Sequence, residues 1–251
     1  MAASLAFLDW TFHFLPEILD RTSQMTQEEI VTTDLTIADQ VAEQHRASAG
    51  QLPADVAEAF AAEQRDLAAA GLPTAAAGPG DRMPDGSLLD VAERPTSLAE
   101  ALGSSPGVIV FYRGGWCPYC NIALRTYQAQ LVPVLAERGI ALVAISPQTP
   151  DGSLSTRETK ELTFTVLSDP GNQIAGQLGI LTAPSDGARA AQLQLGLDLT
   201  KVNADGTTAL PMPTVVVVDA AGVIRWIDVR GDYTTRTEPA QVLQAITQTI
   251  G

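Results

Sequence analysis

The chain has 251 residues, 45% of them apolar, and a formal net charge of −14 with only two lysines, Lys160 and Lys201. This apolar share is enough for a buried core, so the composition predicts a folded globular protein. A strongly acidic chain is poorly suited to neutralising phosphate, which argues against nucleic acids and anionic membrane surfaces as partners. No apolar run approaches the roughly 20 residues that span a bilayer, and Asp9 interrupts the apolar start before a signal-peptide core develops, so we expect a cytoplasmic protein.

The amino-terminal part is predicted to be helical. Residues 1–24 are crowded with apolar side chains and are expected to form a helix packed on the body. The pattern is also helical from Thr26 to Gly71, most clearly from Asp55 to Ala70, and Gly71 is placed where a left-handed helix end belongs. The small residues of 74–80 have the composition of a linker. We therefore expect a helical extension over 1–73 and a second domain over 74–251.

The second domain is predicted to alternate strands and helices. A capping box at Ser97 starts a short helix, and Gly107–Tyr112 and Ala141–Ser146 are apolar runs typical of buried strands. Between these strands a helix is expected from Pro118 to about Arg138, kinked at Pro133. A strand, a helix and a strand in this order imply a parallel pair with a right-handed crossover.

The rest of this domain is predicted to hold a helix over Ser168–Gly179 with Asp169 as its N-cap, a hairpin over 214–229 and a closing helix over Glu238–Ile250. The result is an α/β fold with a central mixed sheet flanked by helices. Residues 181–210 remain as a long segment with a weak helical pattern near Ala188–Leu195. Long loops in compact domains are usually functional, so this segment is a candidate cover for the site.

The only two cysteines, Cys117 and Cys120, follow the first of these strands and precede its helix. If Cys117 is the N-cap and Pro118 the first helical residue, Cys120 takes the third helical position. Both sulfurs then face the positive end of a helix, which stabilises a thiolate. Lowering a thiol pKa from about 8.5 to about 6.5 raises its thiolate fraction at neutral pH from roughly 3% to roughly 75%. The spacing also allows the two sulfurs to close a disulfide.

Other uses of the pair are less well supported. A structural zinc site needs two further ligands, and the only histidines, His13 and His45, fall outside the predicted second domain. A purely structural buried pair is not expected at a tryptophan-led turn before a helix. The pattern therefore favours redox chemistry with no metal and no cofactor.

Residues Gly80 to Ile250 resemble the alkyl hydroperoxide reductase and thiol-specific antioxidant branch of the thioredoxin-fold proteins, the peroxiredoxin-like proteins. The segments that carry the resemblance are GDRMPD (80–85), FYRGGWCPYCN (111–121), LSDPGNQIAGQLGI (167–180), PTVVVVDAAGVIRW (213–226) and DYTTRTEP (232–239). The resemblance implies a thioredoxin-like fold and a thiol-dependent peroxidase. Its partners would be a hydroperoxide and a thiol reductant such as thioredoxin or glutathione, and a homodimer is an open alternative to a monomer.

Two family patterns compete for the same residues. Aligned with peroxiredoxins, Arg113 takes the place of a proline, Cys117 that of a threonine, and Cys120 that of the cysteine that attacks peroxide. Aligned with thioredoxins, Cys117 is the attacking thiol, and Pro213-Thr214 resembles the cis-proline position opposite the thiols. We favour Cys120 in a peroxidase. A disulfide reductase that uses Cys117 first and a non-catalytic redox sensor remain as alternatives.

The resemblance also suggests supporting residues. Arg113 is either a cation that stabilises the thiolate and orients peroxide, or a solvated turn residue. Trp116 is expected to pack beside the thiols and limit solvent. The arginines of the carboxy-terminal part either reach the pocket or line the surface, and the sequence does not separate these cases: Arg225, Arg230 and Arg236.

Overall fold

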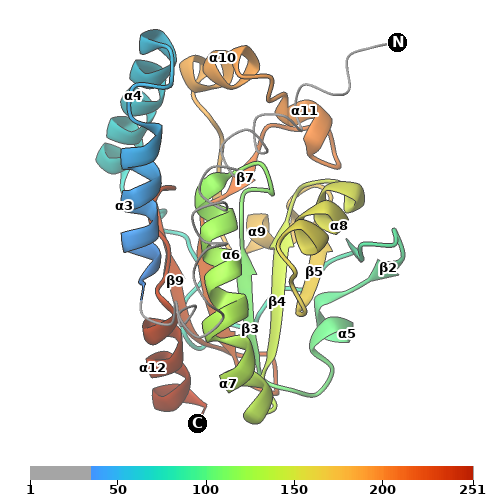
Figure 1. Cartoon of the computed structure of the whole chain (residues 1–251). Helices are drawn as coiled ribbons and strands as arrows, with labels where there is room; N and C mark the ends of the chain where they lie inside the picture. Colours follow the sequence, from blue (N-terminus) through green and yellow to red (C-terminus); the bar gives the residue numbers. More distant parts are fainter. Residues whose placement is uncertain (1–34, 251) are drawn as a thin grey trace.

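A seven-stranded mixed sheet forms the centre of the computed structural model, which describes residues 35–250 (Figure 1). The predicted helix in residues 1–24 and His13 lie outside these residues. The strands, in sheet order, are β2 (Pro95–Thr96), β1 (Leu88–Leu89), β5 (Thr165–Ser168), β4 (Ala141–Ser146), β3 (Gly107–Phe111), β8 (Thr214–Val218) and β9 (Ile224–Val229). The predicted parallel pairing of β3 with β4 and the β8–β9 hairpin are confirmed. A separate two-stranded sheet pairs β6 (Leu181–Thr182) with β7 (Leu210–Pro211).

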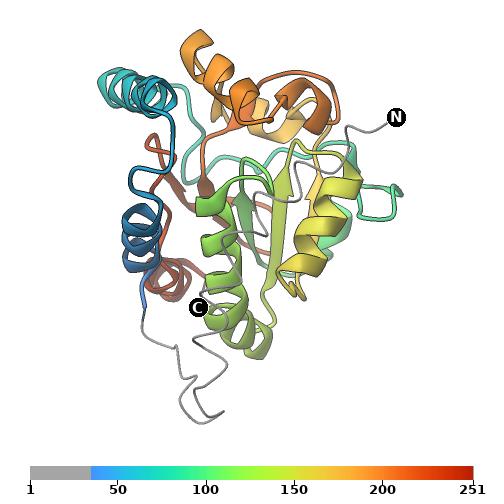
Figure 2. The ribbon, with the colours of Figure 1, turned by 45° about the horizontal axis from the view of Figure 1, so that its top comes forward.

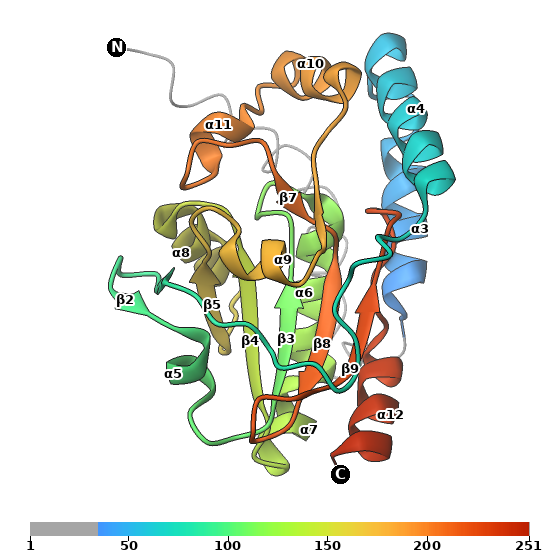
Figure 3. The same cartoon turned by 180° about the vertical axis from the view of Figure 1, so that it is seen from behind.

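Helices cover both faces of the main sheet. The described helices are α3 (Ile37–Ser48), α4 (Ala54–Ala70), α5 (Leu98–Leu102), α6 (Pro118–Gln130), α7 (Val132–Glu137), α8 (Pro150–Thr159), α9 (Gln173–Gln177), α10 (Asp186–Gln194), α11 (Leu199–Val202) and α12 (Pro239–Thr249). Side chains of α3, α6 and α12 share one apolar core with Val108 and Val110, whereas α5 and α9 cover Ile109 and Phe111 on the opposite face, seen from behind in Figure 3. This alternation along β3 is that of a strand buried on both sides.

The helix predicted over Pro118–Arg138 is divided into two. The break falls at Leu131, which is both the C-cap of α6 and the N-cap of α7. Pro133 lies in the first turn of α7. A proline has no N–H to bond to the carbonyl four residues earlier, and its ring collides with that carbonyl. The predicted kink is therefore confirmed, as a full interruption.

The amino-terminal helices pack on the body. Ile37 and Val41 of α3 belong to the core around α6 and α12, and the Glu238 carboxylate accepts hydrogen bonds from the N–H groups of Ile37 and Ala38, both at 2.9 Å. Helix α4 ends at Gly71 as predicted; the φ of Gly71 is positive, at 69°, but its ψ of −165° is extended and not left-handed helical. Figure 2 shows α4 beside α10, with which it packs. The domain boundary near residue 73 stays a prediction.

Three local expectations change. The helix expected over Ser168–Gly179 is only α9, because Asn172 adopts a left-handed conformation with φ of 50° and the helix begins after it. Asp169 is therefore not the N-cap, although its carboxylate still accepts from the N–H groups of Gln173 and Ile174. Helix α8 was not predicted, because its sequence PDGSLSTRET has no apolar period.

The segment 181–210 is more structured than predicted. It contains α10, where the weak helical pattern lies, and the short α11. Through residues 35–250, no helix combines the length and the apolar character that crossing a membrane requires.

Candidate active site

The cysteine pair lies where β3 passes into α6. Cys117 is the N-cap, Pro118 the first helical residue and Cys120 the third, as predicted. Both thiols are free and buried, with 1% of Cys117 and none of Cys120 exposed. The helix start therefore holds two reduced sulfurs away from solvent.

Arg236 is the cation nearest these sulfurs among the described contacts. Its Nη2 lies 3.0 Å from Sγ of Cys120 and 3.7 Å from Sγ of Cys117, and the side chain is buried. Its Nη1 donates to the backbone oxygens of Tyr233 and Thr235, at 2.7 and 2.6 Å, which hold the guanidinium in place. The sequence left Arg236 undecided between pocket and surface. Its position in the DYTTRTEP segment was the available signal.

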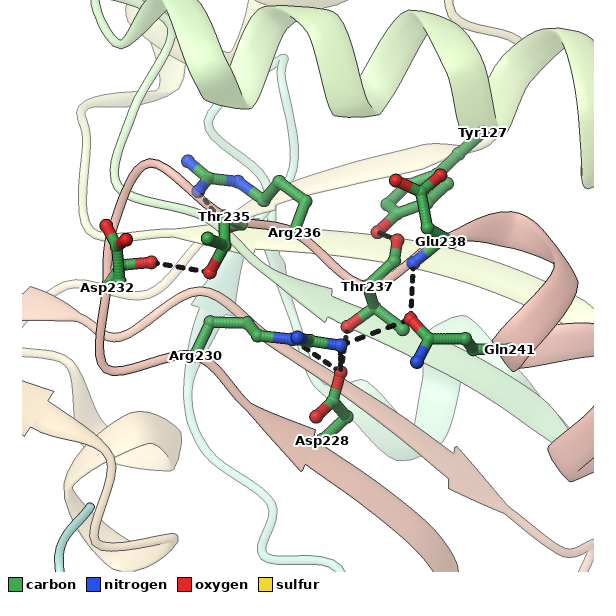
Figure 4. A network of polar contacts seen from close by, with 9 residues as sticks. All are labelled: Tyr127, Asp228, Arg230, Asp232, Thr235, Arg236, Thr237, Glu238 and Gln241. Carbon is green, nitrogen blue, oxygen red and sulfur yellow. Dashed lines mark hydrogen bonds and ion pairs between the residues drawn. The ribbon is translucent and has the colours of Figure 1, made fainter. Parts of the chain in front are cut away.

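The loop that carries Arg236 is itself tied down (Figure 4). Thr237 bonds through its hydroxyl to Asp228, at 2.7 Å, and through its backbone oxygen to the hydroxyl of Tyr127, at 2.6 Å. Arg230 forms an ion pair with Asp228 at 2.6 Å and also donates to Gln241. Arg230 thus belongs to the support of the loop, whereas Arg225 pairs with Asp219 near the hairpin turn.

The surroundings shift the pKa values of the two thiols in opposite directions. Burial alone would raise the pKa of Cys120, but a hydrogen bond from Cys117, the charge of Arg236 and the backbone N–H of Arg113 hold it well below the usual thiol value. Burial raises the pKa of Cys117, and its hydrogen bond to Cys120 raises it further. Because the thiol of Cys117 donates this hydrogen bond to the sulfur of Cys120, Cys120 carries the thiolate and Cys117 keeps the proton.

Arg113 is a buried residue of the site and not a solvated turn residue. Only 5% of it is exposed, and its guanidinium lies 4.1 Å from the ring centre of Tyr233 and 5.2 Å from that of Trp116. Within the described residues, Nε of Arg113 and Nε1 of Trp116 are buried donors without a hydrogen-bond partner. The burial of these two donors leaves Arg113 and Trp116 with unused hydrogen-bonding capacity.

Trp116 joins the thiol pair to the 181–210 segment. It is partly buried and packs against the main core and against a small cluster formed by Leu197, Leu199 and Leu210. The segment that the sequence marked as a candidate cover therefore touches a neighbour of Cys117.

Pro213 and Thr214 lie beside Cys120, with which they line a cavity of about 10 Å³. Such a space holds about one water molecule. The cis-proline prediction is wrong, since no peptide bond in residues 35–250 is cis. Between β7 and β8, the backbone N–H of Met212 donates to the backbone oxygen of Ile180, and the backbone oxygen of Pro213 accepts from the N–H of Arg230, both at 2.8 Å.

His45 is engaged elsewhere than with the sulfurs. Its Nε2 lies 2.9 Å from the hydroxyl of Tyr119, the residue between Pro118 and Cys120. Across the part of the chain that the structure describes, no cluster of His, Cys, Asp and Glu could hold a metal ion.

Solved structures share this fold. BcpB of Mycobacterium tuberculosis matches with a TM-score of 0.51 and 20% identity, over 68% of this chain and 94% of that one. A peroxiredoxin-like protein of Aquifex aeolicus matches with a TM-score of 0.55 and 14% identity, over 70% and 90%. Prx3 of Vibrio vulnificus, solved with hydrogen peroxide, matches with a TM-score of 0.54 and 15% identity, over 67% and 97%. The predicted thioredoxin-like fold is confirmed.

Sequence comparison points to the same family. A Haemophilus influenzae protein provisionally named peroxiredoxin bcp is 36% identical over 104 residues, which are 40% of this chain and 64% of that protein, just under two thirds of its length. The model of the AhpC/TSA family matches residues 79–227, more than half of the chain. This chain belongs to the AhpC/TSA family.

Proposed function

We propose that the protein is a thiol-dependent peroxidase that reduces hydrogen peroxide or alkyl hydroperoxides through Cys120 and Cys117. The observation that carries the proposal is the 3.0 Å contact between Arg236 and Cys120, a buried cation against a buried sulfur. A guanidinium in this position stabilises the thiolate, which is the nucleophilic form of the thiol.

The reaction begins on Cys120. Its thiolate attacks one oxygen of the hydroperoxide, so that an S–O bond forms, the O–O bond breaks, and an alcohol or water leaves after taking up a proton. Arg236, whose guanidinium lies against Cys120, is suited to bind the peroxide oxygens as negative charge moves onto the leaving one. Cys120 is then a sulfenic acid.

Cys117 completes the cycle. Its sulfur attacks the oxidised sulfur of Cys120, a disulfide forms and water leaves. An external dithiol, or two monothiols, then reduces the disulfide and is itself oxidised to a disulfide. Thioredoxin and glutathione are the proposed reductants. A reducing compartment such as the cytoplasm suits this step, and association into a homodimer stays a prediction.

A disulfide reductase that uses Cys117 first is the second candidate, favoured by the tryptophan before the C-x-x-C pair and its place at a helix start. Against it stand the burial of Cys117 and its raised pKa. A non-catalytic redox sensor is the third candidate, and it would be oxidised once by peroxide without turnover.

Peroxide consumption by the wild type, Cys120→Ser and Cys117→Ser, each with thioredoxin or glutathione, tests the proposal. We expect Cys120→Ser to be inactive and Cys117→Ser to react once and leave a sulfenic acid on Cys120 that a specific trapping reagent labels. Turnover by Cys120→Ser with loss of activity in Cys117→Ser would reverse the two roles. Insulin reduction faster than peroxide turnover would favour the reductase, and the absence of turnover with any reductant would favour the sensor.

A further inference from the structure

A buried glutamine outside the cysteine motif contacts the turn that presents it. Gln148 follows β4 and is 3% exposed. Its Oε1 accepts a hydrogen bond from the backbone N–H of Gly115, at 2.8 Å. None of the roles described above uses this side chain.

Gly115 lies inside the turn that ends at Cys117. The N–H of Cys117 donates to the backbone oxygen of Gly114, at 3.1 Å, which closes the turn, and the backbone oxygen of Gly115 accepts from Nδ2 of Asn121, at 2.9 Å. Both peptide groups of Gly115 therefore have fixed partners. There is little room for another arrangement, because a Cβ on Gly115 would lie 2.2 Å from Oγ1 of Thr156.

The amide nitrogen of Gln148 contacts residues at the start of the turn and on α8. Nε2 of Gln148 donates to Oγ1 of Thr156, at 3.1 Å, and lies 3.3 Å from the hydroxyl of Tyr112. Tyr112 is buried and directly precedes Arg113, whose backbone N–H faces Cys120. A single side chain thus spans residues 112–115 from both ends.

Gln148 is in turn anchored by the 181–210 segment. The N–H of Thr149 donates to the backbone oxygen of Val202, at 2.9 Å, and the N–H of Ala204 donates to that of Pro147, at 2.8 Å. These two bonds hold the backbone on both sides of Gln148.

We propose that Gln148 is a positioning residue that holds the 112–117 turn and thereby keeps the N–H of Arg113 and the thiol of Cys117 directed at Cys120. Replacing its amide by an apolar group leaves the buried N–H of Gly115 without a partner, so the turn must shift to find one. The inference deepens the proposed function, on which it rests for the role of Cys120.

The test is the thiolate titration of Cys120 in Gln148→Met, a change that keeps the length of the side chain and removes its hydrogen bonds. Thiolate absorbance is followed against pH, and each variant is compared with the same variant carrying Cys120→Ser. We expect the apparent pKa of Cys120 to rise by about one unit, which lowers the thiolate fraction below that pKa about tenfold.

Gln192→Met provides the matched control, because Gln192 is also buried but belongs to α10. If Gln148→Met does not fold, Thr156→Val, which removes one acceptor of the same amide, should shift the pKa in the same direction by less. A shift in the folded variants no larger than that of Gln192→Met overturns the proposal. The titration consumes no peroxide, so a wild type without peroxidase activity would overturn the proposed function and leave the positioning role measurable.

Discussion

At the scale of single residues, one buried arginine, Arg236, makes the two thiols differ in acidity. In the part of the chain described, no carboxylate forms an ion pair with Arg236, and its side chain is buried beside Cys120. A buried guanidinium without an anion is costly, so its presence favours the ionised form of the nearest acid. That acid is the Cys120 thiol.

Replacing Arg236 by methionine should therefore raise the pKa of Cys120 by more than about one unit and slow its reaction with peroxide at neutral pH by about tenfold or more. Stopped-flow measurement of the first peroxide reaction against pH checks both effects. Arg225→Met is the control, since Arg225 pairs with Asp219 near the hairpin turn and not in the support of the loop that carries Arg236. Equal pH profiles for wild type and Arg236→Met would remove the arginine from the mechanism.

At the scale of elements, the turn between β3 and α6 brings the backbone of Gly114 close to the side chain of Trp116. Gly114 has φ of 149°, and a Cβ there would lie 2.3 Å from Nε1 of Trp116. An alanine could fit only if the indole moved. Gly114 therefore leaves the space that the indole of Trp116 occupies.

Gly114→Ala is expected to lower the free energy of unfolding by roughly 1–3 kcal/mol, the usual range for overpacking. Urea unfolding of the reduced protein measures it. Gly139→Ala is a matched comparison, because Gly139 also has a positive φ, of 64°, but nothing lies within 4 Å of the added Cβ. The larger loss should occur at Gly114, and equal losses would mean that Trp116 yields without cost.

At the scale of the whole molecule, the amino-terminal helices α3 and α4 and the 181–210 segment contact residues near the cysteine pair and one another. His45 of α3 contacts Tyr119, the carboxylate of Glu63 in α4 accepts from the N–H of Ser185, and Leu199 of α11 belongs to the cluster against Trp116. The thiolate is consequently buried by the fold as a whole. Its ionisation must then be coupled to folding.

This coupling predicts how stability depends on pH. Cys120 has a lower pKa in the folded protein than in the unfolded chain, so its contribution is complete above the unfolded thiol pKa and is lost as pH falls through the folded pKa. Cys117 has a raised pKa and acts in the opposite sense, above the unfolded value. Urea unfolding of wild type and Cys120→Ser across pH should show a stability difference that shrinks on acidification. A difference that stays constant would contradict a depressed pKa for Cys120.

Much of the site was predictable from local pattern. The apolar run before Cys117 and Pro118 after it were enough to place both sulfurs at the start of α6, because strand and helix signals there agree. The break at Pro133 follows equally from the chemistry of one residue. Helix α8 was not predictable in this way, since its polar sequence is stabilised by tertiary contacts such as the bond between Ser153 and Ser168.

The sequence by itself determined the cysteine pair and its place at a helix start, because both depend on short-range spacing, and it determined the family through the ordered segments between residues 80 and 239. Only the tertiary structure decided which thiol is ionised. Arg236 is 116 residues from Cys120 along the chain, and Gln148 is 33 residues from Gly115. No local pattern predicts which of several arginines or buried amides the fold will bring to the sulfurs, since that depends on how the loop between β9 and α12 and the 181–210 segment pack against the main sheet.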